Sequence, residues 1–392
     1  MTAVTSWLKR LRKLASAGTA ADRSRALGAF ALSRALAWAA GGAAIGLWGM
    51  HSNADRFDPG SVARGPWAYW DSTWFLEIAR HGYDRAEDAA FFPLYPLLLK
   101  ATGASVAGGV LVSLACFAAA LWLLHRLVAL DFGERVAGLT VLLVALFPAS
   151  AYFSAVYSES LFLLLSVGAV YAARTDRWAL AGLAGALATG TRSAGIVLLV
   201  PLALLWWRSA PRRPAAAAWL ALVPLGLVAF CAYLGLSGED ALGPFRAQDA
   251  WNRGATWPFG GAWDGVRAAW EGFGEIVRGE PRTWPVYDTA WLDIGLLATL
   301  VAALVALAGA VRRLPTAYSL YALAALALPL TFPTEGQPLM SLPRFVAVLW
   351  PLHLWLALAV VERTGPRRAV LAASACGLVL VSGEVSTWGW VA

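Results

Sequence analysis

Long runs of apolar residues alternate with short polar stretches along most of this chain. A helix needs roughly 20 apolar residues to cross a hydrocarbon layer of about 30 Å. Runs of suitable length predict about eleven spans, or about nine or ten if the short runs 178–190 and 194–207 form one broken element. The runs begin near Ala26, Val106, Val136, Ser158, Trp178, Ala194, Ala215, Trp291, Thr316, Phe345 and Ala369. We therefore predict an all-α polytopic membrane protein, with residues 1–392 forming one integral membrane domain.

Composition leads to the same class. Hydrophobic residues make up 59% of the chain and charged residues only 14%, which is more apolar than soluble domains. The first run, 26–50, is too long for a secretory signal peptide and is predicted to remain as a span. Cys116, Cys231 and Cys376 all fall within apolar runs, where packing is their default role and a disulfide framework is unsupported.

The distribution of charge predicts the orientation, because short cytoplasmic loops collect Lys and Arg. With a cytoplasmic N-terminus, a basic arm at 1–25 and every inner loop carry arginine, whereas most acidic residues fall outside. Two long loops, 51–105 and 237–290, then lie on the extracytoplasmic side. The net charge of +7 follows from this topology, and the dispersed basic groups do not favour nucleic acid as a partner.

The first outer loop contains two predicted in-plane helices. Trp74, Phe75 and Ile78 recur at helical spacing, and His81-Gly82 is a typical helix end. Pro93 fits the first turn of a second helix that starts a run of aromatic residues. The second outer loop is rich in tryptophan, which favours interfacial anchoring over stacking on a sugar.

Asp71 stands at the start of the first in-plane helix and carries two interpretations. Its side chain is a candidate N-cap, accepting a hydrogen bond from an orphan backbone N–H. It is equally a candidate catalytic carboxylate, aimed toward the membrane at the head of an apolar stripe. The position three residues later is Trp74, so no capping box decides between them.

Several other charged residues are candidates for either a structural or a functional role. Arg192 and Arg344 lie at the outer ends of predicted spans, where the positive-inside tendency gives no reason for arginine. Arginine within a bilayer needs a partner, and Glu159 or Glu335 is available as a structural one. Arg34 and Glu77 are interpreted as structural, His81 as a turn residue before any ligand role, and Asp84 and Asp88 as solvated loop charges.

Several segments together resemble a known family. The run WDSTWFLEIARHGYD from Trp70, followed by AAFFPLYP at 89–96, is similar to the first luminal loop of the PIG-V family of membrane mannosyltransferases, within the GT-C glycosyltransferase superfamily. Weaker similar pieces follow at 156–173, 187–195 and 341–357. The alanine, arginine and tryptophan bias is typical of a high-GC, actinobacterial-type bacterium.

This resemblance implies a GT-C-type helical bundle and transfer of mannose from a polyprenyl-phosphate donor to a glycan, lipid or protein hydroxyl. The reaction would be inverting, on the extracytoplasmic side of the cell membrane, with Asp71 as base. Arg192 and Arg344 would bind the donor phosphate, so no metal or other cofactor is expected. Substrate-contact candidates are Trp70, Glu159, His81 and Tyr83.

Two other functions fit the sequence. One is a carrier that moves a lipid-linked sugar between leaflets, although carriers place polar groups near the midplane, often in repeated halves. The polar cluster here lies at the predicted outer boundary. The other is a non-catalytic partner of a second transferase.

Overall fold

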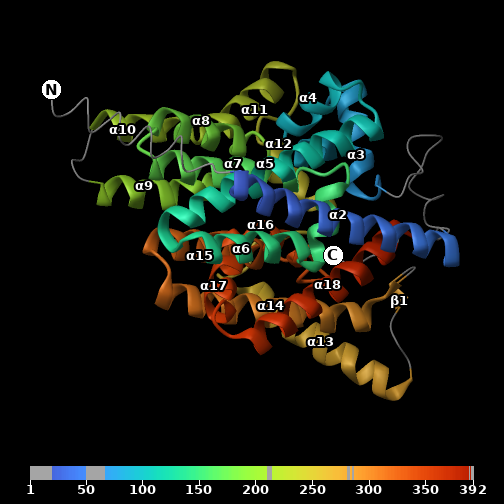
Figure 1. Ribbon diagram of the computed structural model, residues 1–392. Coiled ribbons are helices and arrows are strands. Elements are labelled where there is room, and N and C mark those ends of the chain that lie inside the picture. The colour runs from blue at the N-terminus through green and yellow to red at the C-terminus, as the bar shows by residue number, and fades with distance from the viewer. Residues whose placement is uncertain are drawn as a thin grey trace.

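The computed structural model describes residues 20–49, 67–209, 214–279, 283–284, 287–387 and 389. Within these ranges the regular structure is almost entirely helical (Figure 1). The prediction of an all-α polytopic membrane protein is confirmed. Residues 1–19 of the predicted basic arm 1–25, and residues 51–66 of the first loop, lie outside the described residues.

Helices form at every apolar run that the sequence singles out. These are α2 (Ala20–Trp48), α5 (Val106–Phe132), α6 (Glu134–Leu146), α7 (Glu159–Arg174), α8 (Trp178–Thr189), α9 (Leu199–Arg208), α10 (Pro214–Ala218), α11 (Leu225–Leu236), α14 (Thr289–Arg313), α15 (Thr316–Thr331), α16 (Leu342–Val348), α17 (Trp350–Val360) and α18 (Thr364–Ser386). Short 3₁₀ helices interrupt or extend them: η3 (Pro148–Ser154), η4 (Ser193–Leu198) and η5 (Trp219–Leu222). The apolar pattern therefore locates the helices well.

The number of membrane crossings is a separate matter. Five described helices are long and apolar enough to span a bilayer, and the number rises to seven if each of two bent pairs is one span. The segments 178–189, 193–208 and 316–331 form shorter apolar helices. The predicted count of about nine to eleven is thus not confirmed.

The two bent helix pairs meet, because α16 packs on η3. The axis turns by 79° between α6 and η3, and by 71° between α16 and α17. Arg34 on α2 donates to the Ser150 carbonyl at 2.8 Å and to the Ser154 hydroxyl at 2.6 Å, so it satisfies acceptors of η3. A buried arginine with these partners stabilises the break, in keeping with the structural role predicted for Arg34.

The first loop forms the two predicted short helices. They are α3 (Asp71–His81), which ends at Gly82 with φ 94°, and α4 (Leu94–Ala101), preceded by Pro93. Their apolar faces pack together through Phe75 and Tyr95, whose ring centroids lie 5.0 Å apart. The predicted helix positions are confirmed. A further 3₁₀ turn, η2 (Ala86–Ala90), connects them.

The second loop packs on the first. It contains α12 (Gly243–Arg246), η6 (Ala247–Trp251), α13 (Gly260–Arg278) and the short antiparallel pair β1 (Thr283–Trp284) and β2 (Tyr287–Asp288). Trp251 lies 5.6 Å from Trp74 and 5.7 Å from Phe91, centroid to centroid. This aromatic cluster fixes the second loop against α3.

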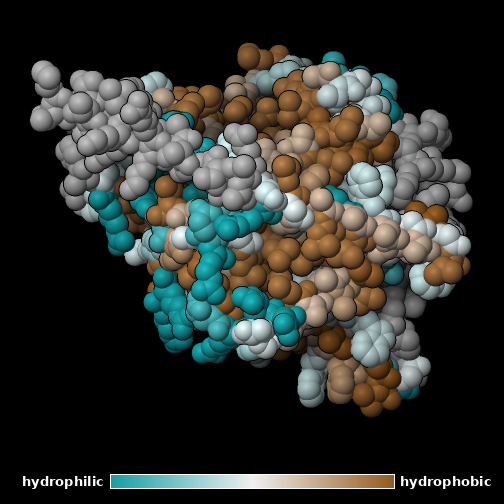
Figure 2. Space-filling view, in the orientation of Figure 1, coloured by the Kyte–Doolittle hydropathy of each residue, from teal (hydrophilic) through white to brown (hydrophobic). Residues whose placement is uncertain are grey.

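The helix α13 extends outward beside α14 (Figure 1). Its glycine face is buried, and a Cβ at Gly265 would meet the Leu339 side chain at 2.5 Å. Trp263 and Trp270 on another face are 60% and 75% exposed, as an interfacial anchor requires. Figure 2 shows hydrophobic side chains over a broad part of one surface, with hydrophilic ones gathered over the region of α15 and α17.

Candidate active site

Asp71 is the first residue of α3, and its side chain does not cap that helix. The N-cap position belongs to Trp70, and no side-chain capping hydrogen bond forms there. The Asp71 carboxylate instead lies 2.7 Å from Nη2 of Arg344, which comes from α16. The capping interpretation is therefore wrong, because the carboxylate points to a distant helix.

Arg344 holds two carboxylates at once. Its Nη2 lies 2.7 Å from Asp71 Oδ2 and 2.8 Å from Glu159 Oε1, and its Nε donates to the same Glu159 oxygen at 2.9 Å. The proline at the second position of α16 and the bend after Val348 place Arg344 on a short helix end. Asp71, Glu159 and Arg344, which are far apart in the sequence, thus meet in one cluster.

Arg192 completes the predicted set. It stands at the break between α8 and η4, and its Nη1 lies 2.9 Å from Glu159 Oε1. Glu159 begins α7 and is fully buried between the two arginines. The structure therefore brings Asp71, Glu159, Arg192 and Arg344 together, and Glu159 serves as the carboxylate partner that the sequence proposed for the arginines.

Exposure separates the two carboxylates. The Asp71 side chain is 27% exposed, whereas the Glu159 side chain is 0% exposed. Within the described part of the chain, Asp71 is therefore the carboxylate of the pair that reaches the surface. Glu159 holds the arginines and does not face solvent, so direct substrate contact, which we also expected of it, is not supported.

Aromatic residues form the floor of the cluster. The Arg344 guanidinium lies 4.6 Å from the ring centroid of Tyr157 and 5.3 Å from that of Tyr152. The Tyr157 hydroxyl accepts a hydrogen bond from the Asp71 backbone N–H at 3.2 Å and donates to the Tyr69 carbonyl at 3.0 Å. These contacts fix the start of α3 beneath the arginine. Trp70, a predicted substrate-contact residue, adjoins them with φ 52°, a strained value for a residue other than glycine.

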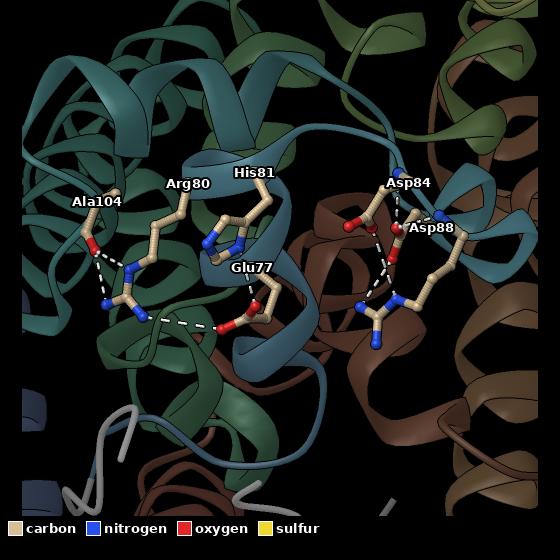
Figure 3. A network of polar contacts seen from close by, with 7 residues as sticks. Glu77, Arg80, His81, Asp84, Asp88 and Ala104 are labelled. Atoms are coloured by element: carbon tan, nitrogen blue, oxygen red, sulfur yellow. Dashed lines mark hydrogen bonds and ion pairs between the residues drawn. The ribbon is translucent and has the colours of Figure 1, made fainter. Parts of the chain in front are cut away.

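His81 lies apart from the cluster. It ends α3, about 15 Å along the helix axis from Asp71. Its Nδ1 is 3.1 Å from Glu77, and Glu77 also lies 3.8 Å from Arg80 (Figure 3). His81 and Glu77 thus form a local pair on the exposed side of α3, which fits their structural interpretation and leaves His81 away from the cluster.

Tyr83 also lies elsewhere. Its hydroxyl donates to the Phe91 carbonyl at 2.7 Å, and its ring packs 5.0 Å from that of Phe230. It lines a separate cavity of about 320 Å³ between η2 and α12, together with Arg85 and Arg246. The structure therefore gives Tyr83 no place beside Asp71.

The prediction that Asp88 is a solvated loop charge is wrong. The sequence favours a solvated loop charge, but its side chain is 1% exposed. It accepts hydrogen bonds from the Arg85 backbone at 3.0 Å and the Arg85 side chain at 3.0 Å (Figure 3). Burial raises the pKa of Asp88, opposed by Arg85. Asp84, 67% exposed, is solvated as expected.

One cation near the cluster is missed by sequence reasoning. Arg253 follows η6 in the second loop, and the charges of Arg344, Asp71 and Arg192 all act on it. An arginine in a long outer loop gives no signal by itself, since the topology already assigns several there. The packing of Trp251 in the second loop on Trp74 and Phe91 in the first loop places Arg253 on the side of the molecule that holds the cluster.

The fold and this cluster define the class of the protein: a helical membrane protein that gathers arginines around one accessible carboxylate. Residues 61–206 match the family model described as Mannosyltransferase (PIG-V). The match confirms the resemblance that the loop motif indicates. It includes Asp71, Glu159 and Arg192 and ends before Arg253 and Arg344.

Individual relatives agree with the family model. GPI alpha-1,6-mannosyltransferase 2 of Rattus norvegicus is 36% identical over 173 residues, covering 37% of this chain and 35% of that protein. The Homo sapiens protein of that name is 34% identical over 148 residues, with 34% and 30% covered. GPI mannosyltransferase 2 of Cryptococcus neoformans is 33% identical over 143 residues, with 32% and 34% covered. The matched stretch spans about a third of the length of these relatives.

Among solved structures, the Archaeoglobus fulgidus oligosaccharyltransferase in complex with Zn and sulfate aligns with a TM-score of 0.45 and 12% identity. The alignment covers 91% of this chain and 53% of that one. Its apo form aligns with a TM-score of 0.44 and 12% identity over 92% and 56% of the two chains.

Proposed function

We propose that this protein is a mannosyltransferase that takes mannose from a polyprenyl-phosphate donor and passes it to a hydroxyl of a glycan, lipid or protein acceptor. The similarity of residues 61–206 to PIG-V mannosyltransferases supports the sugar and the reaction class. The extracytoplasmic side of the cell membrane is its location, as the charge distribution of the loops predicts.

The observation that carries the proposal is the contact between Asp71 and Arg344. It unites a partly exposed carboxylate, suited to accept a proton, with cationic groups suited to hold a phosphate. These are the two functions that transfer from a sugar phosphate requires. Both belong to one small region of the structure.

The reaction then proceeds by one displacement. The acceptor hydroxyl oxygen attacks the anomeric carbon and forms the new glycosidic bond, while its proton passes to the Asp71 carboxylate. The bond from the anomeric carbon to the phosphate oxygen breaks, and its electron pair leaves with the polyprenyl phosphate. Attack opposite to the departing oxygen inverts the configuration, so a β-linked donor gives an α-mannoside.

Arg192 and Arg344 stabilise the departing phosphate by charge-assisted hydrogen bonds. Arginine is suited to this role because its planar guanidinium matches the geometry of phosphate oxygens. Since cationic side chains supply the positive charge, we propose that transfer is independent of metal ions. Full activity in excess EDTA is the expected result.

The test uses purified protein in lipid nanodiscs with labelled polyprenyl phosphate mannose and a panel of acceptors. Asp71→Asn should lower the transfer rate by about 10²–10⁴-fold, the usual contribution of a general base. Glu77→Gln is the matched control, since Glu77 lies on the same helix and pairs only locally. Transfer by Asp71→Asn at the wild-type rate would remove Asp71 as the base.

A second measurement tests the location. Single cysteines replace Glu239 in the second loop and Arg312 at the end of α14, both exposed, in a chain whose three native cysteines are removed. A membrane-impermeant maleimide added to intact cells should label position 239 and leave position 312 unlabelled. The opposite labelling would reverse the proposed orientation.

A further inference from the structure

The cluster of predicted site residues is electrically balanced before any substrate arrives. Arg192 and Arg344 carry two positive charges, and Asp71 and Glu159 carry two negative ones. Arg344 already contacts both carboxylates. A donor with a sugar phosphodiester adds one negative charge to this site. On these four residues alone, that charge would have no counterpart.

Arg253 supplies an additional positive charge. The second loop is held here by backbone contacts to the segment that leads into α16: the Glu335 N–H donates to the Asn252 carbonyl at 2.9 Å, and Arg253 pairs with Thr334 as a β-bridge. The backbone at Arg253 is therefore held against the segment that leads into the helix of Arg344. Trp251, packed against the rings of both Trp74 and Phe91, fixes the other side of the turn against α3.

The charge of Arg253 is not neutralised by a close carboxylate in the described part of the chain. Its side chain donates one long hydrogen bond, from Nη1 to the Phe332 carbonyl at 3.4 Å. Burial, followed by repulsion from Arg344, lowers the pKa of Arg253 to about 10, against a smaller opposing effect of Asp71. Arg253 thus stays cationic at neutral pH, close to the cluster, with donor capacity to spare.

Six described residues other than glycine have a positive φ, and three of these adjoin Asp71, Arg253 and the helix of Arg344. Trp70, Asn252 and Ser341 have φ values of 52°, 50° and 66°, all in the left-handed region that favours glycine. Two of them immediately precede Asp71 and Arg253, and Ser341 is the N-cap residue of the helix that carries Arg344. Such conformations are strained, and they are common where a side chain must be held in a set direction.

We propose that Arg253 is a phosphate-binding residue that contacts the lipid-linked phosphodiester of the donor and supplies the charge that balances it. This inference rests on the proposed function. Arg253 then joins Arg192 and Arg344 in receiving the incoming anion, while Arg344 also holds Asp71 and Glu159 in place. The second loop is then part of the donor site, and its packing on α3 sets the separation between the phosphate and the base.

The experiment measures lipid binding directly, by native mass spectrometry of the full chain in detergent. Polyprenyl phosphate is compared with the neutral polyprenol of the same length, and the donor KM and kcat are measured in nanodiscs. The variants are Arg253→Gln, Arg253→Lys and the control Arg246→Gln, which removes an exposed arginine of the same loop that pairs with Asp240. Thermal unfolding checks that each variant is folded.

Arg253→Gln should weaken polyprenyl phosphate binding and raise the donor KM by about ten- to a hundredfold, the value of a hydrogen bond to a charged group. The kcat should change little, polyprenol binding should not change, and Arg253→Lys should recover part of the affinity. Arg246→Gln should behave as wild type.

The alternatives give different patterns. If folded Arg253→Gln binds polyprenyl phosphate as tightly as wild type, while Asp71→Asn abolishes transfer, the assignment of Arg253 is wrong and the proposed function stands. If wild type binds polyprenyl phosphate no better than polyprenol, the donor class itself is wrong, and the assignment of Arg253 is overturned with it.

Discussion

In the described part of the chain two arginines, Arg34 and Arg344, are buried, and their surroundings differ in kind. Arg34 on α2 donates to neutral, fixed acceptors: the hydroxyls of Ser150 and Ser154 and a backbone carbonyl of η3. Arg344 on α16 contacts two carboxylates, one of them partly exposed. The acceptors of Arg34 belong to η3 and cannot be replaced without unfolding that segment. The carboxylates around Arg344 are side chains, and under the proposed function they can shift to admit another anion.

Under the proposed function, this difference distinguishes a structural arginine from a substrate-binding one. Both side chains carry a cost of burial that partners must offset. At Arg34 the partners are the unpaired groups of a broken helix, so the arginine and the break stabilise each other. At Arg344 the partners are charged groups from α3 and α7, and two further arginines stand nearby. Among the described residues, our proposal adds Arg253 to a balanced set of two arginines and two carboxylates, and this surplus of positive charge would suit an anionic ligand.

The largest effect is expected from Arg344→Gln. Removing one partner of a buried ion pair leaves Glu159 short of positive charge, which should lower the free energy of unfolding by about 3–5 kcal/mol. Transfer should be lost together with stability. Chemical unfolding in detergent and the donor assay measure the two quantities.

The double variant Glu159→Gln/Arg344→Gln is the control for this prediction. It removes the charges on both sides of the pair, so most of the stability should return while transfer stays absent. If stability does not return, packing and not charge accounts for the loss in the single variant.

Arg34→Met should have an intermediate effect. The substitution leaves acceptors of η3 without their donor, at a cost of about 1–3 kcal/mol in the free energy of unfolding. Because Arg34 faces no carboxylate of the candidate site, the donor KM of the folded variant should remain within about threefold of wild type, well below the effect of a lost charge contact. A tenfold rise in KM at unchanged stability would contradict the comparison.

Tyr157→Phe should have the smallest effect. It removes the hydroxyl that joins the Asp71 backbone N–H to the Tyr69 carbonyl, while the ring stays beneath Arg344. The expected cost is about 1 kcal/mol of stability. A misplaced Asp71 should lower kcat more than it raises the donor KM. An unchanged kcat would show that Asp71 is positioned by Arg344 alone.

Sequence reasoning succeeded where the signal is local. The bounds of α3 follow from apolar spacing and from His81-Gly82, and the start of α4 follows from Pro93. It failed for Asp88, because a buried loop carboxylate depends on the backbone N–H groups that fold around it. His81 has its partner Glu77 one turn away on the same helix, in keeping with its interpretation as a turn residue before any ligand role.

The sequence by itself determined that this protein is an apolar helical bundle, where its helices lie, and which arginines lack a topological reason. These properties follow from hydrophobic periodicity and residue type, which act over a few turns. Only the tertiary structure decided that Asp71 contacts Arg344, that Glu159 is enclosed between arginines, and that Arg253 pairs with the segment leading into α16. Such contacts depend on how distant helix ends pack, and neither spacing nor composition records that.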